Sequence, residues 1–479
     1  MRRLLSITTA LAAVAGLCGT AVAQTAPASP LQGQLIAPPG AYVGPNNNNS
    51  ALGTARKGPA ANPTPGTMVI HLGGRVLFQW FQGWNSLNTP GNERTSNQMQ
   101  TWLRLYPGMD AMAANGLRYG GQMEIRTNNT SISARTPTGV NTNPGSGASS
   151  QDNTQSLYLR RAFIYMGTNE LGIIRLGRAD GLIGLFDGGR ATFQSISGNG
   201  ALNGSDLQSS IGGSTAPPFV FLAGSGNEYT TTKIVYLSPN FSGFDFGAGY
   251  VPNAAAGAGF CGATVGSACS NLITSTNPLE GERFKDLVQA GVRYSGPVGP
   301  VNVLAYGIYN YGGHVNTNLT PAAARTFVGA PAASTWDGQY DNLNFGQFGA
   351  TITYAGFTVG GAYIGGAVNG QLGARPSGGA NMNSFLVGAQ YRTGPFQVGV
   401  AYEQIEEQGA VALTGLSQRK EYALVVGTTY NLAPGLQLWA DYIYQNRKQS
   451  GFNFQTGTVG TANNNIQGQG FVLGTTVTW

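Results

Sequence analysis

Residues 470–479 read GFVLGTTVTW, and this stretch at the end of the chain alternates strictly between two faces. One face carries the bulky side chains, which are Phe471, Leu473, Val477 and Trp479. The other face carries mostly glycine and threonine. This period-two pattern predicts a β-strand that runs to the terminal residue, where soluble domains usually have a few frayed polar residues. The stretch therefore favours a strand that is paired along its whole length.

The composition of the chain narrows the class of protein. Only 10% of the 479 residues are charged, and 73 are glycine. After the first 23 residues no apolar run reaches the roughly eighteen residues that a membrane helix requires. Three classes remain, which are a soluble multi-domain β protein, a fibrous surface protein and a membrane β-barrel. The arginines and lysines are scattered rather than clustered, so nucleic-acid binding is not predicted.

The N-terminal part of the chain has two regions that precede any strand pattern. Residues 1–23 combine Arg2 and Arg3 with a short apolar run and an Ala-Val-Ala end, which predicts a cleaved secretory signal peptide. Residues 24–66 are rich in proline and asparagine and have almost no charge. We expect them to form a flexible periplasmic extension that is dispensable for the remaining chain. Residues 67–479 then carry the strand pattern.

Short and long separators alternate along residues 67–479. The short ones, rich in glycine, asparagine or proline, are residues 113–116, 168–172, 239–243, 296–300, 355–356, 393–395 and 431–435. The long ones are residues 85–97, 130–153, 180–228, 252–283, 314–342, 369–382, 408–418 and 450–466. Together they divide the region into sixteen strands. Short periplasmic turns, long external loops and an even strand number are typical of an outer-membrane barrel, whereas a soluble sandwich or a structural surface protein does not require this rhythm.

Each expected strand has one apolar and one polar face, as a closed barrel in a membrane requires. In residues 117–128, Leu117, Tyr119 and Met123 lie on one side, and arginines, a glutamine and a glutamate lie on the other. A membrane offers no water to unpaired backbone groups, so strands can cross it only as a closed barrel. We therefore predict an all-β, transmembrane antiparallel barrel of about sixteen strands. Its last strand, ending at Trp479 in the interfacial aromatic girdle, pairs with the first strand near Thr67.

Residues 157–181, LYLRRAFIYMGTNELGIIRLGRADG, resemble a strand-turn-strand segment of the general bacterial porins. In that family an R-x-A-F segment leads to a turn and then to an L-G-R ending, and the aromatic C-terminus is a second, weaker match. The resemblance implies a trimeric, sixteen-stranded, water-filled channel in the outer membrane of a Gram-negative bacterium. It also implies that the long loop beginning at Asp180 takes the place of the inward-folded third loop. Phe471 and Trp479 are then the candidate signal for the barrel-assembly machinery.

Polar residues on the inward faces are candidates for the narrowest part of the channel. Arginines on the wall would face carboxylates on the third loop and create a transverse field across the pore. The candidates are Arg75, Arg104, Arg118, Arg126, Arg160, Arg175, Asp187 and Asp206. The arginines outnumber the acids, so we expect a mild preference for anions. The alternative is that these arginines only make the channel wall hydrophilic and do not line its narrowest part.

Arg161 stands beside Leu159 and Phe163 on the outward face, if the strand alternates without interruption. A charge that faces lipid is costly. We therefore expect Arg161 to lie either at a subunit interface of a homotrimer or at a strand irregularity.

Other chemistry has little support in the sequence. Histidine occurs only at His71 and His314, and no metal-binding or phosphate-binding motif is present, so we expect no enzymatic activity, metal or cofactor. Cys261 and Cys269 are predicted to form a disulfide within one loop of the exported chain. The expected partners are outer-membrane lipids and small hydrophilic solutes. The predicted function is passive diffusion of such solutes and ions, with a sugar-selective or anion-selective porin and a structural adhesin as alternatives.

Overall fold

A computed structural model describes most of the strand-forming part of the chain. It describes residues 63–87, 96–127, 157–168, 170–186, 231–254, 272–328, 336–413 and 415–479. The predicted signal peptide and residues 24–62 of the predicted extension lie outside these ranges. None of the helices in the described residues combines the length and the apolarity needed to cross a bilayer.

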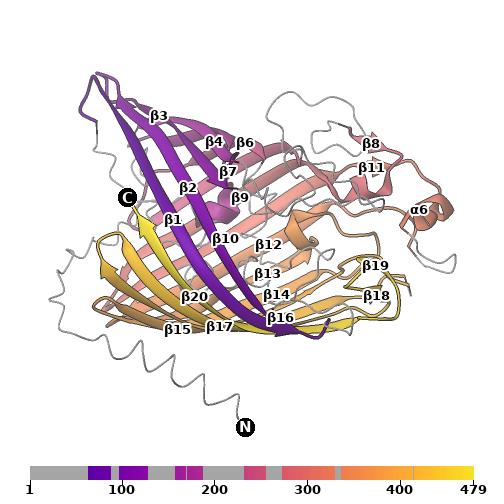
Figure 1. Ribbon diagram of the computed structural model, residues 1–479. Coiled ribbons are helices and arrows are strands. Elements are labelled where there is room, and N and C mark those ends of the chain that lie inside the picture. The colour runs from indigo at the N-terminus through magenta and orange to yellow at the C-terminus, as the bar shows by residue number, and fades with distance from the viewer. Residues whose placement is uncertain are drawn as a thin grey trace, which may run out of the picture.

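Sixteen strands form one closed antiparallel barrel, as predicted (Figure 1). The first eight are β1 (Thr67–Asn85), β2 (Asn97–Met112), β3 (Arg118–Thr127), β4 (Leu157–Thr168), β5 (Gly172–Arg178), β6 (Thr232–Leu237), β7 (Phe244–Asn253) and β9 (Phe284–Val298). The other eight are β10 (Val301–His314), β12 (Leu343–Tyr354), β13 (Phe357–Ala367), β14 (Met382–Thr393), β15 (Phe396–Glu407), β16 (Arg419–Ala433), β17 (Leu436–Lys448) and β20 (Asn465–Thr478). Each strand pairs with its neighbours in chain order, so the ring has no open edge.

The seam between the first and last strands closes the barrel, as the terminal sequence pattern predicted. β1 and β20 pair from Arg75 opposite Thr478 to Asn85 opposite Gly468. The Trp479 N–H donates to the Gly74 carbonyl at 3.1 Å, and the Gly74 N–H donates to the Trp479 carbonyl at 3.2 Å. The Trp479 indole is about half exposed and lies over Gly74, where there is no room for a Cβ atom.

The connections alternate in length as the sequence predicted. The seven short connections follow β2, β4, β6, β9, β12, β14 and β16, and the eight long ones follow the strands between these. The connection after β12 consists of Ala355 and Gly356, whose φ angles are 47° and 86°. Positive φ at both positions is typical of the tightest hairpin turns, because the twist of such a turn matches that of the strands.

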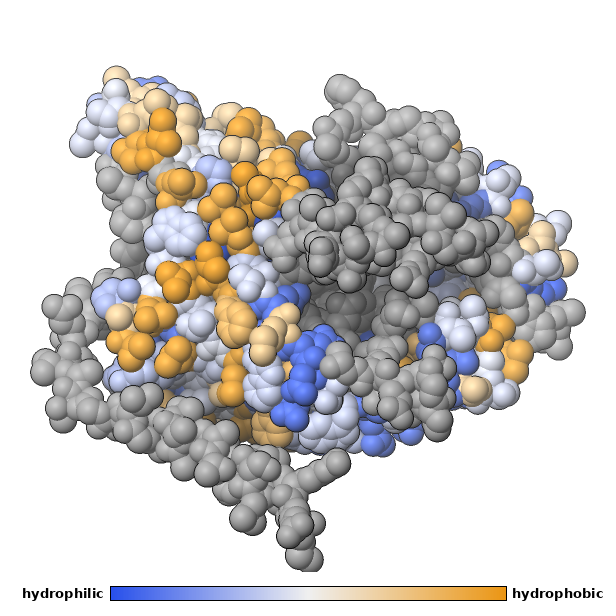
Figure 2. Space-filling model, viewed as in Figure 1, coloured by the Kyte–Doolittle hydropathy of each residue, from blue (hydrophilic) through white to orange (hydrophobic). Residues whose placement is uncertain are grey.

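The two faces of the barrel wall differ in chemistry. Met68, Ile70, Leu72 and Phe78 point outward from β1 and are exposed, whereas Arg75 on the opposite face is 3% exposed. Figure 2 shows hydrophobic residues spread over the outer surface of the wall. An apolar exterior and a polar interior are what the membrane requires of a barrel.

Shorter elements lie in the long connections. They are α2 (Leu182–Phe186), β8 (Thr274–Ser275), η2 (Pro278–Glu282), β11 (Asn316–Thr317), α6 (Pro321–Val328), η3 (Gly370–Leu372), β18 (Phe452–Asn453) and β19 (Thr458–Val459). Two small hydrophobic clusters stabilise these loops. One contains Trp336 and Tyr340, and the other contains Phe452 and Phe454.

Candidate functional site

Three arginines form a row across the inner wall of β1, β2 and β3. Arg75 lies directly opposite Arg104, and Arg104 lies directly opposite Arg126. All three are buried inside the barrel. Like charges at directly opposite positions destabilise a sheet. The row therefore costs stability, which is typical of groups retained for function rather than for folding.

A β-bulge in β4 places two consecutive arginines inside the barrel. Glu124 pairs with Arg161, whereas the next residue, Ile125, pairs with Leu159, so Arg160 is the extra residue. A bulge shifts the alternation of the strand by one position. The expectation that Arg161 faces outward is therefore wrong, and of the two environments expected for it the structure supports the strand irregularity.

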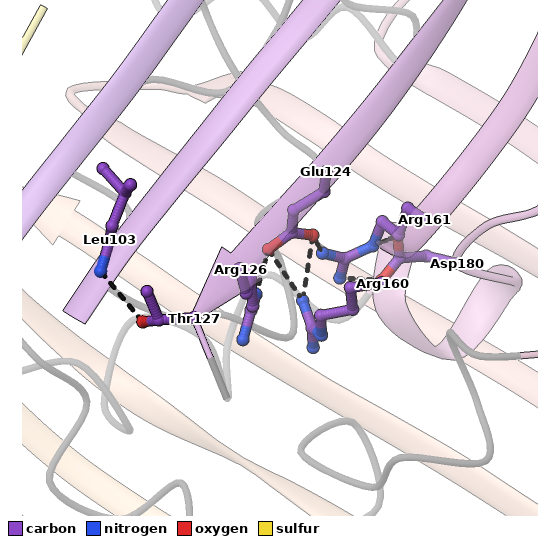
Figure 3. Close-up of polar contacts among 7 residues, drawn as sticks. All are labelled: Leu103, Glu124, Arg126, Thr127, Arg160, Arg161 and Asp180. Carbon is purple, nitrogen blue, oxygen red and sulfur yellow. Dashed lines mark hydrogen bonds and ion pairs between the residues drawn. The ribbon is translucent and has the colours of Figure 1, made fainter. Parts of the chain in front are cut away.

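Glu124 is the centre of a buried ion network (Figure 3). Its carboxylate contacts Arg126 and Arg161, and it also accepts from Arg160 Nη1 at 3.1 Å. Arg161 makes a second, two-pronged pair, with Nε 2.6 Å from Asp180 Oδ2 and Nη2 2.8 Å from Asp180 Oδ1. Bidentate pairs of this kind fix orientation as well as adding energy. The network therefore links the wall to the residue where the third loop begins.

The first described residues of the third loop lie inside the barrel. Lys233 Nζ donates to the Ala179 carbonyl at 2.6 Å, and the Leu182 N–H donates to Gln289 Oε1 at 3.2 Å. The loop then forms α2, which contacts β7, β9 and β10 and is almost entirely buried. The prediction that the third loop folds into the lumen is confirmed for this segment.

Wall glycines make room for the α2 side chains. Gly247 and Gly291 lie directly opposite each other on β7 and β9. A Cβ atom at Gly247 would lie 2.6 Å from Leu182 Cδ2, and one at Gly291 would lie 3.1 Å from Phe186 Cδ2. The hollow that these two glycines leave in the wall is therefore filled by α2.

Arg293 holds the other end of α2. Its guanidinium lies 5.2 Å from the centre of the Phe186 ring, and Nη1 donates to the Leu185 carbonyl at 3.3 Å. Asp245 balances its charge, with Nη2 to Oδ2 at 3.0 Å. Neither Arg293 nor Asp245 was among the residues predicted from the sequence. The only indication in the sequence was a single charge on the expected inward face of each strand. That the two charges pair with each other could not be predicted, because it depends on the register between β7 and β9.

The remaining predicted constriction arginines lie apart from the row. Arg118 is at the short-turn end of β3, eight residues from Arg126, or about 26 Å along the strand. Arg175 lies opposite Tyr165, and its guanidinium is 4.2 Å from the centre of the Phe163 ring. The structure thus brings Arg75, Arg104, Arg126 and Arg160 together and leaves Arg118 and Arg175 elsewhere.

Several predicted residues lie outside the described ranges. These are Asp187, Asp206, Cys261 and Cys269. The loop acids and the disulfide therefore remain predictions. Within the described ranges, no group of three or more His, Cys, Asp or Glu side chains is placed to hold a metal ion.

Comparison with known proteins gives one family and several similar structures. The model of the Gram-negative porin family matches residues 8–450. The chain is similar to an anion-selective porin from Comamonas acidovorans (15% identity, TM-score 0.48, covering 86% of this chain and 100% of that one). It is also similar to OmpF from Salmonella typhi in complex with daunomycin (16%, 0.49, covering 86% and 97%) and to in-vitro folded OmpT from Vibrio cholerae (12%, 0.46, covering 88% and 100%).

A search of curated proteins found no match. The family match spans most of the chain, and the sixteen-stranded barrel fits it. The chain therefore belongs to the Gram-negative porin family and is an outer-membrane porin.

Proposed function

We propose that the pore admits small hydrophilic solutes by passive diffusion, with a mild preference for anions, and carries out no enzymatic step. The main support for the anion preference is the row of Arg75, Arg104 and Arg126. With Arg160 and Arg161, five arginines in this region face two described carboxylates, Glu124 and Asp180. The excess of positive charge lies on one side of the lumen.

The expected selectivity is weak because the pore contains water. A unit charge about 8 Å from a passing ion contributes about 0.5 kcal/mol in water, and salt with a Debye length of about 8 Å screens this to about 0.2 kcal/mol. The contribution has opposite signs for anions and cations, so each charge changes the anion-to-cation ratio about two-fold. An excess of a few charges therefore biases the ionic current and does not exclude cations.

Planar-bilayer recording in a salt gradient tests the proposal. Replacing Arg75 and Arg104 together by Ser should shift the zero-current potential toward cations, by about four-fold in the permeability ratio. Arg325→Ser removes one positive charge from α6 in an external loop and should leave the potential unchanged. An unshifted potential in the double variant, with conductance steps intact, would contradict the proposed role of the row.

The same recording separates general diffusion from a substrate-selective channel. General diffusion predicts a conductance that rises in proportion to salt concentration and is not blocked by any one solute. Saturable block by a single sugar or anion would favour the selective alternative. The absence of any conductance step would contradict the channel itself.

We propose a homotrimer whose subunits meet at β5 and β6. These strands have only seven and six residues. At about 3.3 Å per residue and a tilt of about 40°, β5 spans about 18 Å of height, against an apolar band of about 25 Å. A wall this low suits contact with a second copy. Arg161, which faces inward, gives this proposal no support.

Unheated gel electrophoresis in detergent tests the oligomer and should show a heat-labile species. Ile234 points outward from β6 and is about half exposed, so Ile234→Trp should weaken this species. Ile352→Trp, the same change on the outward face of β12, should have no effect. A monomer at all temperatures would refute the trimer.

Export and assembly of the chain complete the proposal. Residues 1–23 are removed as a signal peptide, residues 24–66 form a periplasmic extension, and Cys261 and Cys269 form a disulfide in an external loop. Phe471 and Trp479 on the last strand serve as the signal for the assembly machinery. Deleting residues 24–60 should leave a functional barrel in the membrane.

A further inference from the structure

The outward face of β15, β16 and β17 changes character along each strand. Near the short turns it is apolar, with Val398, Val426 and Leu438 exposed. Val400, Leu424 and Ala440 occupy the next outward positions, and tyrosines follow them, which are Tyr402, Tyr422, Tyr442 and Tyr444. In membrane barrels, aromatic residues of this kind mark the boundary between hydrocarbon and headgroups. The outward residues beyond the tyrosines therefore lie at the level of the lipid headgroups on the external side.

Two lysines lie side by side at this level. Lys420 on β16 is directly opposite Lys448 on β17, and on its other side it is opposite Glu406 on β15. The chain contains only five lysines, so a direct pair of them is unusual. Lys448 is exposed, and the half-buried Lys420 retains 40% of the accessible surface of its side chain.

This arrangement has an excess of positive charge. Glu406 Oε1 lies 2.8 Å from Lys420 Nζ and offsets one lysine. Like charges directly opposite each other on a sheet are unfavourable. The two ammonium groups together with one carboxylate leave a net positive site that faces the membrane surface, and an anion placed between the lysines would relieve their repulsion.

We propose that Lys420 and Lys448 bind the phosphate of a lipid headgroup in the outer leaflet of the membrane. The aromatic boundary places the site at the depth of such phosphates, and the lysine pair supplies the complementary charge. Lysine suits this role because its ammonium group is a compact point charge on a flexible stem. The proposal rests on the outer-membrane location of the chain and is independent of the pore's selectivity.

Titration with lipid A in detergent micelles, followed by native mass spectrometry, tests the site. Each lysine near an anionic lipid surface contributes about a five-fold effect on affinity. Lys420→Gln and Lys448→Gln should each weaken binding about five-fold, and the double variant should weaken it about twenty-five-fold. Glu406→Gln removes the competing carboxylate and should strengthen binding. Heat-dependent gel mobility verifies that each variant is folded.

The direction of the Glu406→Gln effect separates a lipid site from a structural ion pair. A structural role predicts that this variant behaves like the lysine variants, and that result would overturn the proposal. Equal lipid A affinity for the parent and the double lysine variant would also overturn it. Inorganic phosphate at the same concentration should not displace lipid A, and full displacement would show a free-anion site instead.

Discussion

Replacing Glu124 by Gln should lower the stability of the barrel and raise its preference for anions at the same time. The Glu124 side chain is 2% exposed and contacts three arginines, which are Arg126, Arg160 and Arg161. Glutamine keeps the shape but removes the charge. The variant therefore removes the counter-charge that Glu124 supplies to three buried guanidinium groups.

The two effects have different magnitudes. Breaking a buried ion pair by removing one partner costs about 3–5 kcal/mol. We expect the lower end, about 3 kcal/mol, because Arg161 retains its bidentate pair with Asp180. The loss of one negative charge from the pore should raise the anion-to-cation permeability ratio about two-fold, because a screened interaction of about 0.2 kcal/mol at about 8 Å acts with opposite signs on anions and cations.

Urea unfolding in micelles and zero-current potentials measure the two quantities. Glu170→Gln is the matched control, since Glu170 is exposed in the short connection between β4 and β5 and should change neither. Asp180→Asn combined with Glu124→Gln should be non-additive, because both carboxylates hold Arg161. A Glu124→Gln variant with parental stability, or with a potential shifted toward cations, would refute the ion network as we describe it.

Three further predictions concern the support of the site. Gly247→Val should destabilise the barrel by about 1–3 kcal/mol, because the added atoms displace α2 from its hollow, and the opening of the third loop should appear as increased current noise. Arg293→Leu leaves the fully buried Asp245 without its counter-charge and should cost about 3–5 kcal/mol in urea unfolding. Trp479→Ala removes the indole that covers Gly74 and should cost about 1–2 kcal/mol, seen as a lower heat-induced gel transition, whereas Trp479→Phe should restore most of the loss.

The sequence by itself determined the barrel. The alternation that begins at Thr67 and ends at Trp479, together with the rhythm of short and long separators, predicted sixteen strands, the outward faces and the closing seam. These features could be predicted because side-chain direction in a strand has a period of two, and turns carry local residue preferences. Both are properties of short segments.

Only the tertiary structure decided which polar residues meet. The sequence predicted that Arg75, Arg104 and Arg126 face inward, but their common row depends on the register between strands, which pairs residues far apart in the chain. The bulge at Arg160 also depends on the tertiary structure. Without it one of the two adjacent arginines would face lipid, which costs free energy, whereas the bulge lets both reach Glu124. The doublet Arg160-Arg161 was its only local signal. Local patterns specify faces, whereas the cross-strand pairing and the ion pairs it permits specify the site.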